Sequence, residues 1–129
     1  MKIDHIAIWT EDLEVAKEFY TKYFNMTCGE KYTNPVKKFS SYFLSFKDSS
    51  VRIELMQRPD ILKHNNKKGI TNGITHFAIS VGSKESVNSI TEELRANKFI
   101  IQGEPRTTGD GCYESVVLDP EGNPIEITE

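Results

Sequence analysis

The chain contains an internal repeat, and this feature constrains its fold more than any other. Residues 3–8 (IDHIAI) align with residues 74–79 (ITHFAI) at an offset of 71 positions, so that a histidine and an alanine coincide in the two copies. Repetition at a fixed spacing indicates two copies of one supersecondary unit. The sequence therefore predicts a duplicated architecture.

Each copy continues with the same order of elements. Asp12 is suited to cap a helix that runs to about Tyr23, and Ser83 is suited to cap a second helix over residues 84–97. Strand-like segments follow at residues 28–32, 40–46 and 51–57 in the first copy and at 99–103, 113–118 and 125–128 in the second. We expect one domain over residues 1–129, with module one at about 1–58, a linker at about 59–72 and module two at about 73–129.

Size and charge exclude several classes of protein. A chain of 129 residues fits a single compact domain. Its net charge is −3 and no basic stripe is present, so nucleic acid is not expected as a partner. No apolar run approaches the ~20 residues of a membrane span, and the two cysteines match neither a zinc motif nor a disulfide framework. These features predict a soluble cytoplasmic protein with no membrane partner.

Four polar residues share one side of the predicted strands. Because strand side chains alternate between the two faces of a sheet, the apolar residues of these strands fall on one face. The opposite face receives one histidine and one glutamate from each half of the chain, namely His5, Glu54, His76 and Glu126. The histidines are 71 positions apart and the glutamates 72, so the two pairs occupy equivalent places in the two copies.

This quartet predicts a metal site. A carboxylate inside a protein stays ionised only when it is paired with a cation, a metal or good hydrogen-bond donors. One divalent ion would hold all four side chains, and two imidazoles with two carboxylates suit zinc, nickel, cobalt, iron or manganese. A glutamate beside a metal-bound substrate oxygen is also placed to move a proton from the adjoining carbon. The alternative interpretation is a polar patch on an open sheet face.

Several motifs resemble those of one superfamily over essentially the whole chain. They are residues 4–8 followed by Asp12-Leu13 and Phe19-Tyr20, residues 53–55, residues 75–78 and the segment 119–127 (DPEGNPIEI). In these motifs the chain resembles the vicinal oxygen chelate superfamily, which includes glyoxalase I, methylmalonyl-CoA epimerase, extradiol dioxygenases and antibiotic-resistance proteins. The resemblance implies an α+β fold in which two tandem βαβββ modules form a curled mixed-sheet cup around one metal, commonly in a homodimer.

The set of four ligands resembles that of glyoxalase I (lactoylglutathione lyase). That resemblance implies a metal-dependent lyase or isomerase that uses Glu126, with Glu54, to move a proton between adjacent carbons of a small substrate such as a hemithioacetal. Zinc or nickel is the expected metal, with cobalt, manganese or iron as alternatives. The alternative functions are an antibiotic-resistance protein that binds or modifies its ligand, and an epimerase of a thioester. The ligands would come from one chain or across a homodimer interface.

The predicted substrate contacts depart from the family pattern. Bacterial glyoxalase I has an arginine four residues after the first histidine, where this chain has Trp9, and the asparagine expected after Glu54 is absent. Arg58 lies nearby in the sequence and is suited to bind an anion. Because the two expected residues are absent, the alternative of a substrate other than a glutathione conjugate stays open. The candidate substrate-binding residues are Trp9, Arg52, Met56, Arg58 and Tyr113.

Overall fold

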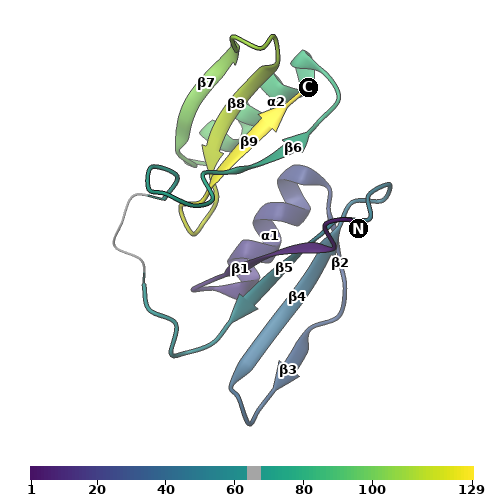
Figure 1. The fold of residues 1–129 in the computed structure, drawn as a ribbon, viewed down its shortest axis with the longest axis vertical. Helices are drawn as coiled ribbons and strands as arrows, with labels where there is room; N and C mark the ends of the chain where they lie inside the picture. The colour runs from purple at the N-terminus through teal and green to yellow at the C-terminus, as the bar shows by residue number, and fades with distance from the viewer. Residues whose placement is uncertain (64–67) are drawn as a thin grey trace. The chain divides into compact units, whose positions relative to one another are not determined.

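The computed structural model describes residues 1–63 and 68–129. The chain divides into two compact units, unit 1 (residues 1–65) and unit 2 (residues 66–129), and each contains one mixed sheet and one long helix (Figure 1). Module one of the sequence analysis lies in unit 1, and module two lies in unit 2. Among the residues that the structure describes, no helix is long and apolar enough to cross a membrane.

Unit 1 is a five-stranded sheet with one helix. Its elements are β1 (His5–Trp9), α1 (Leu13–Phe24), β2 (Thr27–Cys28), β3 (Tyr32–Asn34), β4 (Phe39–Ser45) and β5 (Arg52–Gln57). The strand order is β1-β5-β4-β2, and β3 also pairs with β4. Among the strand pairs in the described residues of unit 1, β1–β5 is parallel and the others are antiparallel, and α1 carries the chain back between β1 and β2.

Unit 2 repeats this plan. Its elements are β6 (Phe77–Ser80), α2 (Lys84–Ala96), β7 (Ile101–Thr107), β8 (Tyr113–Leu118) and β9 (Pro124–Thr128). The strand order is β6-β9-β8-β7, with β6 and β9 parallel and the other pairs antiparallel. The predicted α+β fold of two tandem modules is thereby confirmed.

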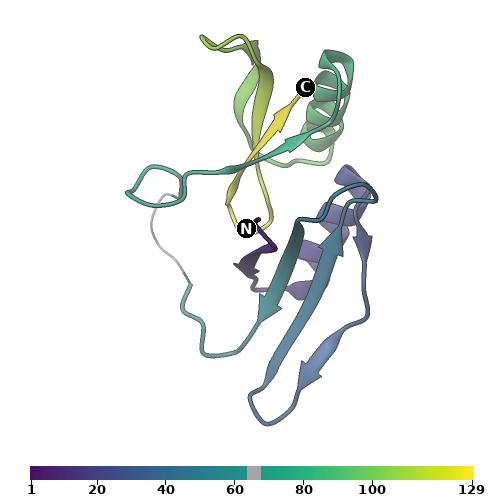
Figure 2. The ribbon, with the colours of Figure 1, turned by 45° about the vertical axis from the view of Figure 1, so that its right-hand side comes forward.

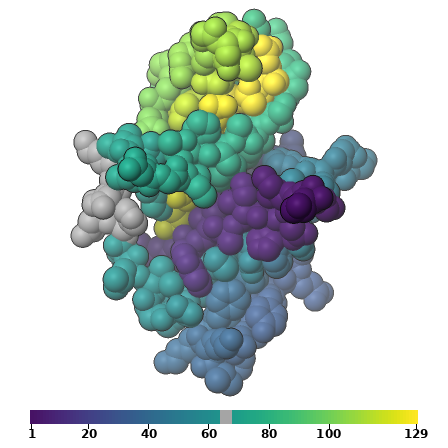
Figure 3. All heavy atoms as spheres, in the orientation of Figure 1, coloured from purple at the N-terminus to yellow at the C-terminus, as the bar shows by residue number. Residues whose placement is uncertain are grey.

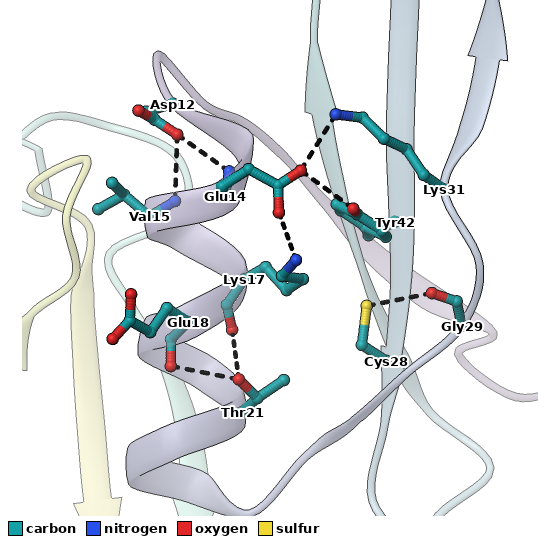
Figure 4. A network of polar contacts seen from close by, with 10 residues as sticks. All are labelled: Asp12, Glu14, Val15, Lys17, Glu18, Thr21, Cys28, Gly29, Lys31 and Tyr42. Atoms are coloured by element: carbon teal, nitrogen blue, oxygen red, sulfur yellow. Dashed lines mark hydrogen bonds and ion pairs between the residues drawn. The ribbon is translucent and has the colours of Figure 1, made fainter.

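Both predicted helix caps are present. The carboxylate of Asp12 accepts two backbone N–H groups of the first turn of α1 (Figure 4), and the hydroxyl of Ser83 accepts the N–H of Ser86 at the start of α2. Asn25 ends α1 in the left-handed conformation, with φ of 52°. These local signals fix where each helix begins, and so which face of it meets the sheet.

Each helix covers one face of the sheet in its own unit (Figures 1 and 2). The residues packed there are apolar and fully or almost fully buried: Leu13, Phe19, Tyr20, Leu44 and Leu55 in unit 1, and Val87, Leu94, Val117, Ile125 and Ile127 in unit 2. The predicted alternation along the strands is confirmed, because the residues between these positions point to the other face, which no helix in the described part of the same unit covers. That other face carries the four predicted metal ligands.

The predicted strand over residues 28–32 is interrupted. It forms β2 and β3, which pair with successive parts of β4. Cys28 pairs with Leu44 and Tyr32 pairs with Ser41. An advance of four residues from Cys28 to Tyr32 is therefore matched by only three residues along β4. One residue therefore bulges out of the ladder, a feature that alternation in the sequence does not reveal.

The predicted strand over residues 99–103 lies further along the chain, as β7. Its register with β8 shifts twice, between Ile101 and Gly103 and between Gly103 and Arg106. Pro105 lies inside the second shift and has no N–H to donate to a ladder. An edge strand with a bulge accommodates such a residue, so β7 continues past the point where the sequence suggested an end.

Candidate metal centre

In unit 1, the pairing of β1 with β5 brings His5 to Glu54. Ala7 is the direct partner of Glu54, and His5 lies two residues earlier on the same face. The His5 Nε2 atom is 3.7 Å from Glu54 Oε2. The small alanine side chain leaves space above the sheet for the carboxylate to reach the imidazole. Only 16% of the Glu54 side chain is exposed.

Unit 2 repeats this arrangement. Ala78 is the direct partner of Glu126 in the parallel pair β6–β9, and His76 lies two residues before Ala78. The His76 Nε2 atom is 3.3 Å from Glu126 Oε2, and 18% of the Glu126 side chain is exposed. The sequence repeat is therefore a repeat of geometry, with one histidine–glutamate pair at the same register in each sheet.

The second nitrogen of each ring also has a partner. His5 Nδ1 lies 2.9 Å from Asp4 Oδ2, and His76 Nδ1 lies 3.2 Å from Thr75 Oγ1. When Nδ1 donates the hydrogen bond, the Nε2 lone pair is left for a ligand, the usual arrangement of metal-binding histidines. The hydrogen bond from His5, with that from Arg52, lowers the pKa of Asp4 below its ordinary value.

Sequence reasoning did not assign a role to Asp4 or Thr75. The signal that could have found them is the repeat itself, because each directly precedes a repeated histidine. A polar partner on the outer ring nitrogen is what a metal-binding histidine almost always has.

The distances within each pair fit a shared ion. Two ligand atoms bound at about 2.0–2.2 Å, at angles between a right angle and the tetrahedral value, are separated by about 2.8–3.6 Å. The pair His76–Glu126 falls in this range at 3.3 Å, and the pair His5–Glu54 lies just above it at 3.7 Å. Within residues 1–63 and 68–129, no three side chains of the ligand-forming types gather into a larger cluster. Each unit thus brings one imidazole nitrogen and one carboxylate oxygen together.

A further carboxylate lies beside Glu126. Glu114 is two residues from Val116, the direct β8 partner of Glu126, and so shares its face. Arg106 Nη2 donates to Glu114 Oε1 at 3.2 Å. Burial raises the pKa of Glu114 above its ordinary value, the charge of Glu126 raises it further, and Arg106 opposes both. A Cβ at Gly103 would lie 3.0 Å from Arg106 Nη1, so this glycine leaves room for the guanidinium to lie across the sheet.

A comparison with known families covers both halves of the chain. The family model of the Glyoxalase/Bleomycin resistance protein/Dioxygenase superfamily matches residues 2–127. The chain belongs to this superfamily. The predicted resemblance is thereby confirmed, and the match includes both histidine–glutamate pairs.

Three relatives within the superfamily illustrate the likeness. The chain is 28% identical to a probable lactoylglutathione lyase of Vibrio cholerae over 99% of this chain and 90% of the relative. The trypanothione-dependent glyoxalase I of Leishmania major is 23% identical, with a TM-score of 0.79 over 100% of this chain and 86% of that one. Glyoxalase I of Zea mays is 25% identical, with a TM-score of 0.81 over 98% of this chain and 44% of that one.

Most of the other predicted site residues share the face of Glu54. Arg52 and Met56 flank Glu54 on β5, and Trp9 is the direct partner of Met56. Arg58 follows β5, and its guanidinium carbon lies 5.4 Å from the centre of the Trp9 ring. Arg52 lies at the His5 end of the face, where it also contacts Asp4, and Arg58 lies at the Trp9 end.

Tyr113 lies on the other face of its sheet. It alternates with Glu114 and shares the side of Ser115, which bonds to Thr91 of α2. Its hydroxyl donates to Asn88 Oδ1 at 2.9 Å, so the ring is held against the helix. The geometry does not bring Tyr113 to His76 and Glu126, and it lies outside the site proposed below.

Proposed function

We propose that this superfamily member is a metal-dependent lyase or isomerase of the glyoxalase I type. Its reaction would move a proton between adjacent carbons of a small chelated substrate, such as a hemithioacetal. The observation that supports this proposal is the repeated pair of histidine and glutamate, each at the same register and each with the second imidazole nitrogen held by a neighbour.

In this proposal His5, Glu54, His76 and Glu126 together hold one divalent ion. Zinc or nickel suits these ligands best, with cobalt, manganese or iron as alternatives. The four ligands come from one chain or from two chains of a homodimer. When bound, the ion polarises the substrate oxygen and stabilises the negative charge that develops on it.

The two glutamates carry the proton in this proposal. Glu126 accepts it at a carboxylate oxygen from one substrate carbon and returns it to the neighbouring carbon, with Glu54 facing the other side of the substrate. Both side chains are more than four-fifths covered, at 18% and 16% exposed. Partial exclusion of water strengthens the interaction of each carboxylate with a developing charge.

Metal content and turnover test the proposal together. The purified protein should retain about one divalent ion per four-ligand site, and His5→Ala or His76→Ala should each abolish that retention. His64→Ala is the control, because His64 is the remaining histidine of the chain. Hemithioacetals and hydroxy-thioesters would then be screened with each of the five metals.

Two results would contradict the proposal. Absence of a retained metal in the wild-type protein would leave the histidine–glutamate pairs as a polar patch. Full metal occupancy without turnover of any substrate in the screen would favour the alternative function, a protein that binds or modifies an antibiotic.

A further inference from the structure

A groove lies at the end of unit 1 where β3 turns into β4 and where β5 ends. Its volume is about 480 Å³, and it is lined by Val36, Lys37, Lys38, Arg58, Pro59 and Asp60. The groove is shallow and open to solvent, so a ligand there would be only partly enclosed. Arg58 Nε donates to Asp60 Oδ1 at 2.5 Å. Three cationic side chains against one carboxylate leave the groove with an excess of positive charge.

An aromatic surface adjoins this groove. Phe39 lies between Trp9 and Tyr32, with ring centres 6.2 Å and 6.1 Å away. Trp9 is 37% exposed and Tyr32 is 56% exposed, so both present ring surface to solvent. The guanidinium of Arg58, 5.4 Å from the centre of the Trp9 ring, connects the aromatic surface to the groove.

The packing of unit 1 does not account for this combination. In the described part of the chain, neither Lys37 nor Lys38 makes an ion pair, and both are exposed. Exposed aromatic residues scattered singly are ordinary on a protein surface, whereas a contiguous group indicates a binding surface. Here the aromatic group adjoins Lys37 and Lys38 at a shallow, open groove, which favours a ligand that is both planar and anionic.

We propose that the groove and the aromatic surface bind a planar aromatic group that carries a phosphate. A phosphate monoester carries about −1.5 to −2 charges at pH 7, which matches the excess of positive charge in the groove. The planar group would lie against Trp9 and Tyr32, as bases do on aromatic side chains.

The position of this surface defines the substrate class. Trp9 lies on the same strand and face as His5, four residues further along, which corresponds to about 13 Å at 3.3 Å per residue. For the reacting end, this inference rests on the function proposed above. The substrate is then elongated, with a chelating carbonyl group near Glu54 at one end and an aromatic phosphate near Arg58 at the other.

The chain has one tryptophan, so its fluorescence reports on this surface directly. Adenosine 5′-monophosphate serves as the probe, with adenosine and inorganic phosphate as its separate halves. The titrations are followed by Trp9 fluorescence and by calorimetry, in the presence of a chelator. We expect saturable binding of the monophosphate, at least about tenfold tighter than that of either half.

Charge variants make the test specific. Lys37→Gln/Lys38→Gln and Arg58→Gln should each weaken binding of the monophosphate at least about fivefold. The matched control is Lys2→Gln/Lys47→Gln, which removes two exposed lysines elsewhere in unit 1 and should leave binding unchanged. Calorimetry also allows Trp9→Ala to be tested, and that variant should lose the preference for the monophosphate over inorganic phosphate.

Absence of saturable binding would overturn the inference, as would equal affinity for adenosine and its monophosphate, or equal loss in the control variant. Because the chelator removes any metal, these outcomes do not depend on the proposed reaction. Failure of the reaction would appear separately, in metal retention and turnover.

Discussion

Asp4 Oδ2 lies 2.9 Å from His5 Nδ1, on the side of the imidazole away from Glu54. The same carboxylate contacts the guanidinium of Arg52. This chain of contacts fixes the orientation of a ring whose other nitrogen faces the proposed metal. The position of Asp4, directly before the first ligand, therefore has a consequence that metal binding can measure.

Asp4→Ala should weaken metal affinity by about 10–100-fold while all four proposed ligands remain, because the outer partner of a ligating histidine has effects of this size. Competition with a chromogenic chelator measures the affinity. Asp48→Ala, in an exposed turn of the same unit, is the control. An unchanged affinity in Asp4→Ala would remove Asp4 from the site.

Glu126→Gln should lower kcat by about 10²–10⁴-fold, the range of general base catalysis, with little change in Tm. The amide keeps the shape of the side chain and loses its capacity to accept the proton. Steady-state kinetics and thermal unfolding are compared with those of Glu85→Gln, on the exposed side of α2. A variant that melts many degrees lower at unchanged specific activity would contradict the role given to Glu126.

Thr91→Val should lower the free energy of unfolding by about 1–3 kcal/mol, because it leaves the buried hydroxyl of Ser115 without its partner. The two hydroxyls lie 2.7 Å apart and both residues are fully buried. The double variant Thr91→Val/Ser115→Ala should recover much of the loss. Denaturant titration of the two single variants and the double variant measures the coupling free energy between Thr91 and Ser115. Strictly additive changes in the free energy of unfolding would refute the predicted coupling.

Glu14 should make unit 1 sensitive to acid. Hydrogen bonds from Lys17, Lys31 and Tyr42 lower its pKa to about 2 (Figure 4). Because the pKa is lowered by folding, the stabilisation is complete above the ordinary value of about 4.5 and is lost as pH falls towards 2.

Glu14→Gln should therefore lower Tm by at most a few degrees near pH 7, since the side chain is largely exposed, and the difference from wild type should vanish near pH 2. Melting curves across this range measure the effect. Glu18→Gln is the control, because Glu18 lies on the same helix and points away from the Lys17–Lys31 cluster in Figure 4. A Tm difference that persists at pH 2 would contradict this origin.

The repeat and the side-chain alternation predicted much of the fold because both can be read directly from the order of residues in the sequence. Asp12 and Ser83 cap the helices as expected, and β8 has the predicted bounds. The bulge between Cys28 and Tyr32 escaped prediction because it depends on the partner strand.

Part of the candidate site could also be predicted from the sequence, and part could not. Side-chain alternation predicted that His5 and Glu54 share one face of the sheet. The parallel pairing of β1 with β5 keeps the two side chains on that face. Side-chain alternation also separates Tyr113 from Glu126, whereas the glycine-containing loop before Tyr113 left a contact with a substrate oxygen open as the less favoured interpretation. The hydrogen bond of Tyr113 to Asn88 of α2 is a tertiary contact that no sequence pattern specifies.

The first residues of the chain lie at the surface, where Met1 and Ile3 are exposed and the purple segment is visible in Figure 3. A tag attached there would adjoin Asp4 and His5, so a C-terminal tag is the safer choice for metal measurements.

The contact between Arg106 and Glu114 in the second sheet depends on the absence of a side chain at Gly103. A larger residue at that position would press on Arg106 Nη1, and the guanidinium would have to shift beside Glu114. A methyl group on an edge strand could thus alter the chemistry of a carboxylate two strands away without replacing any residue that meets the substrate.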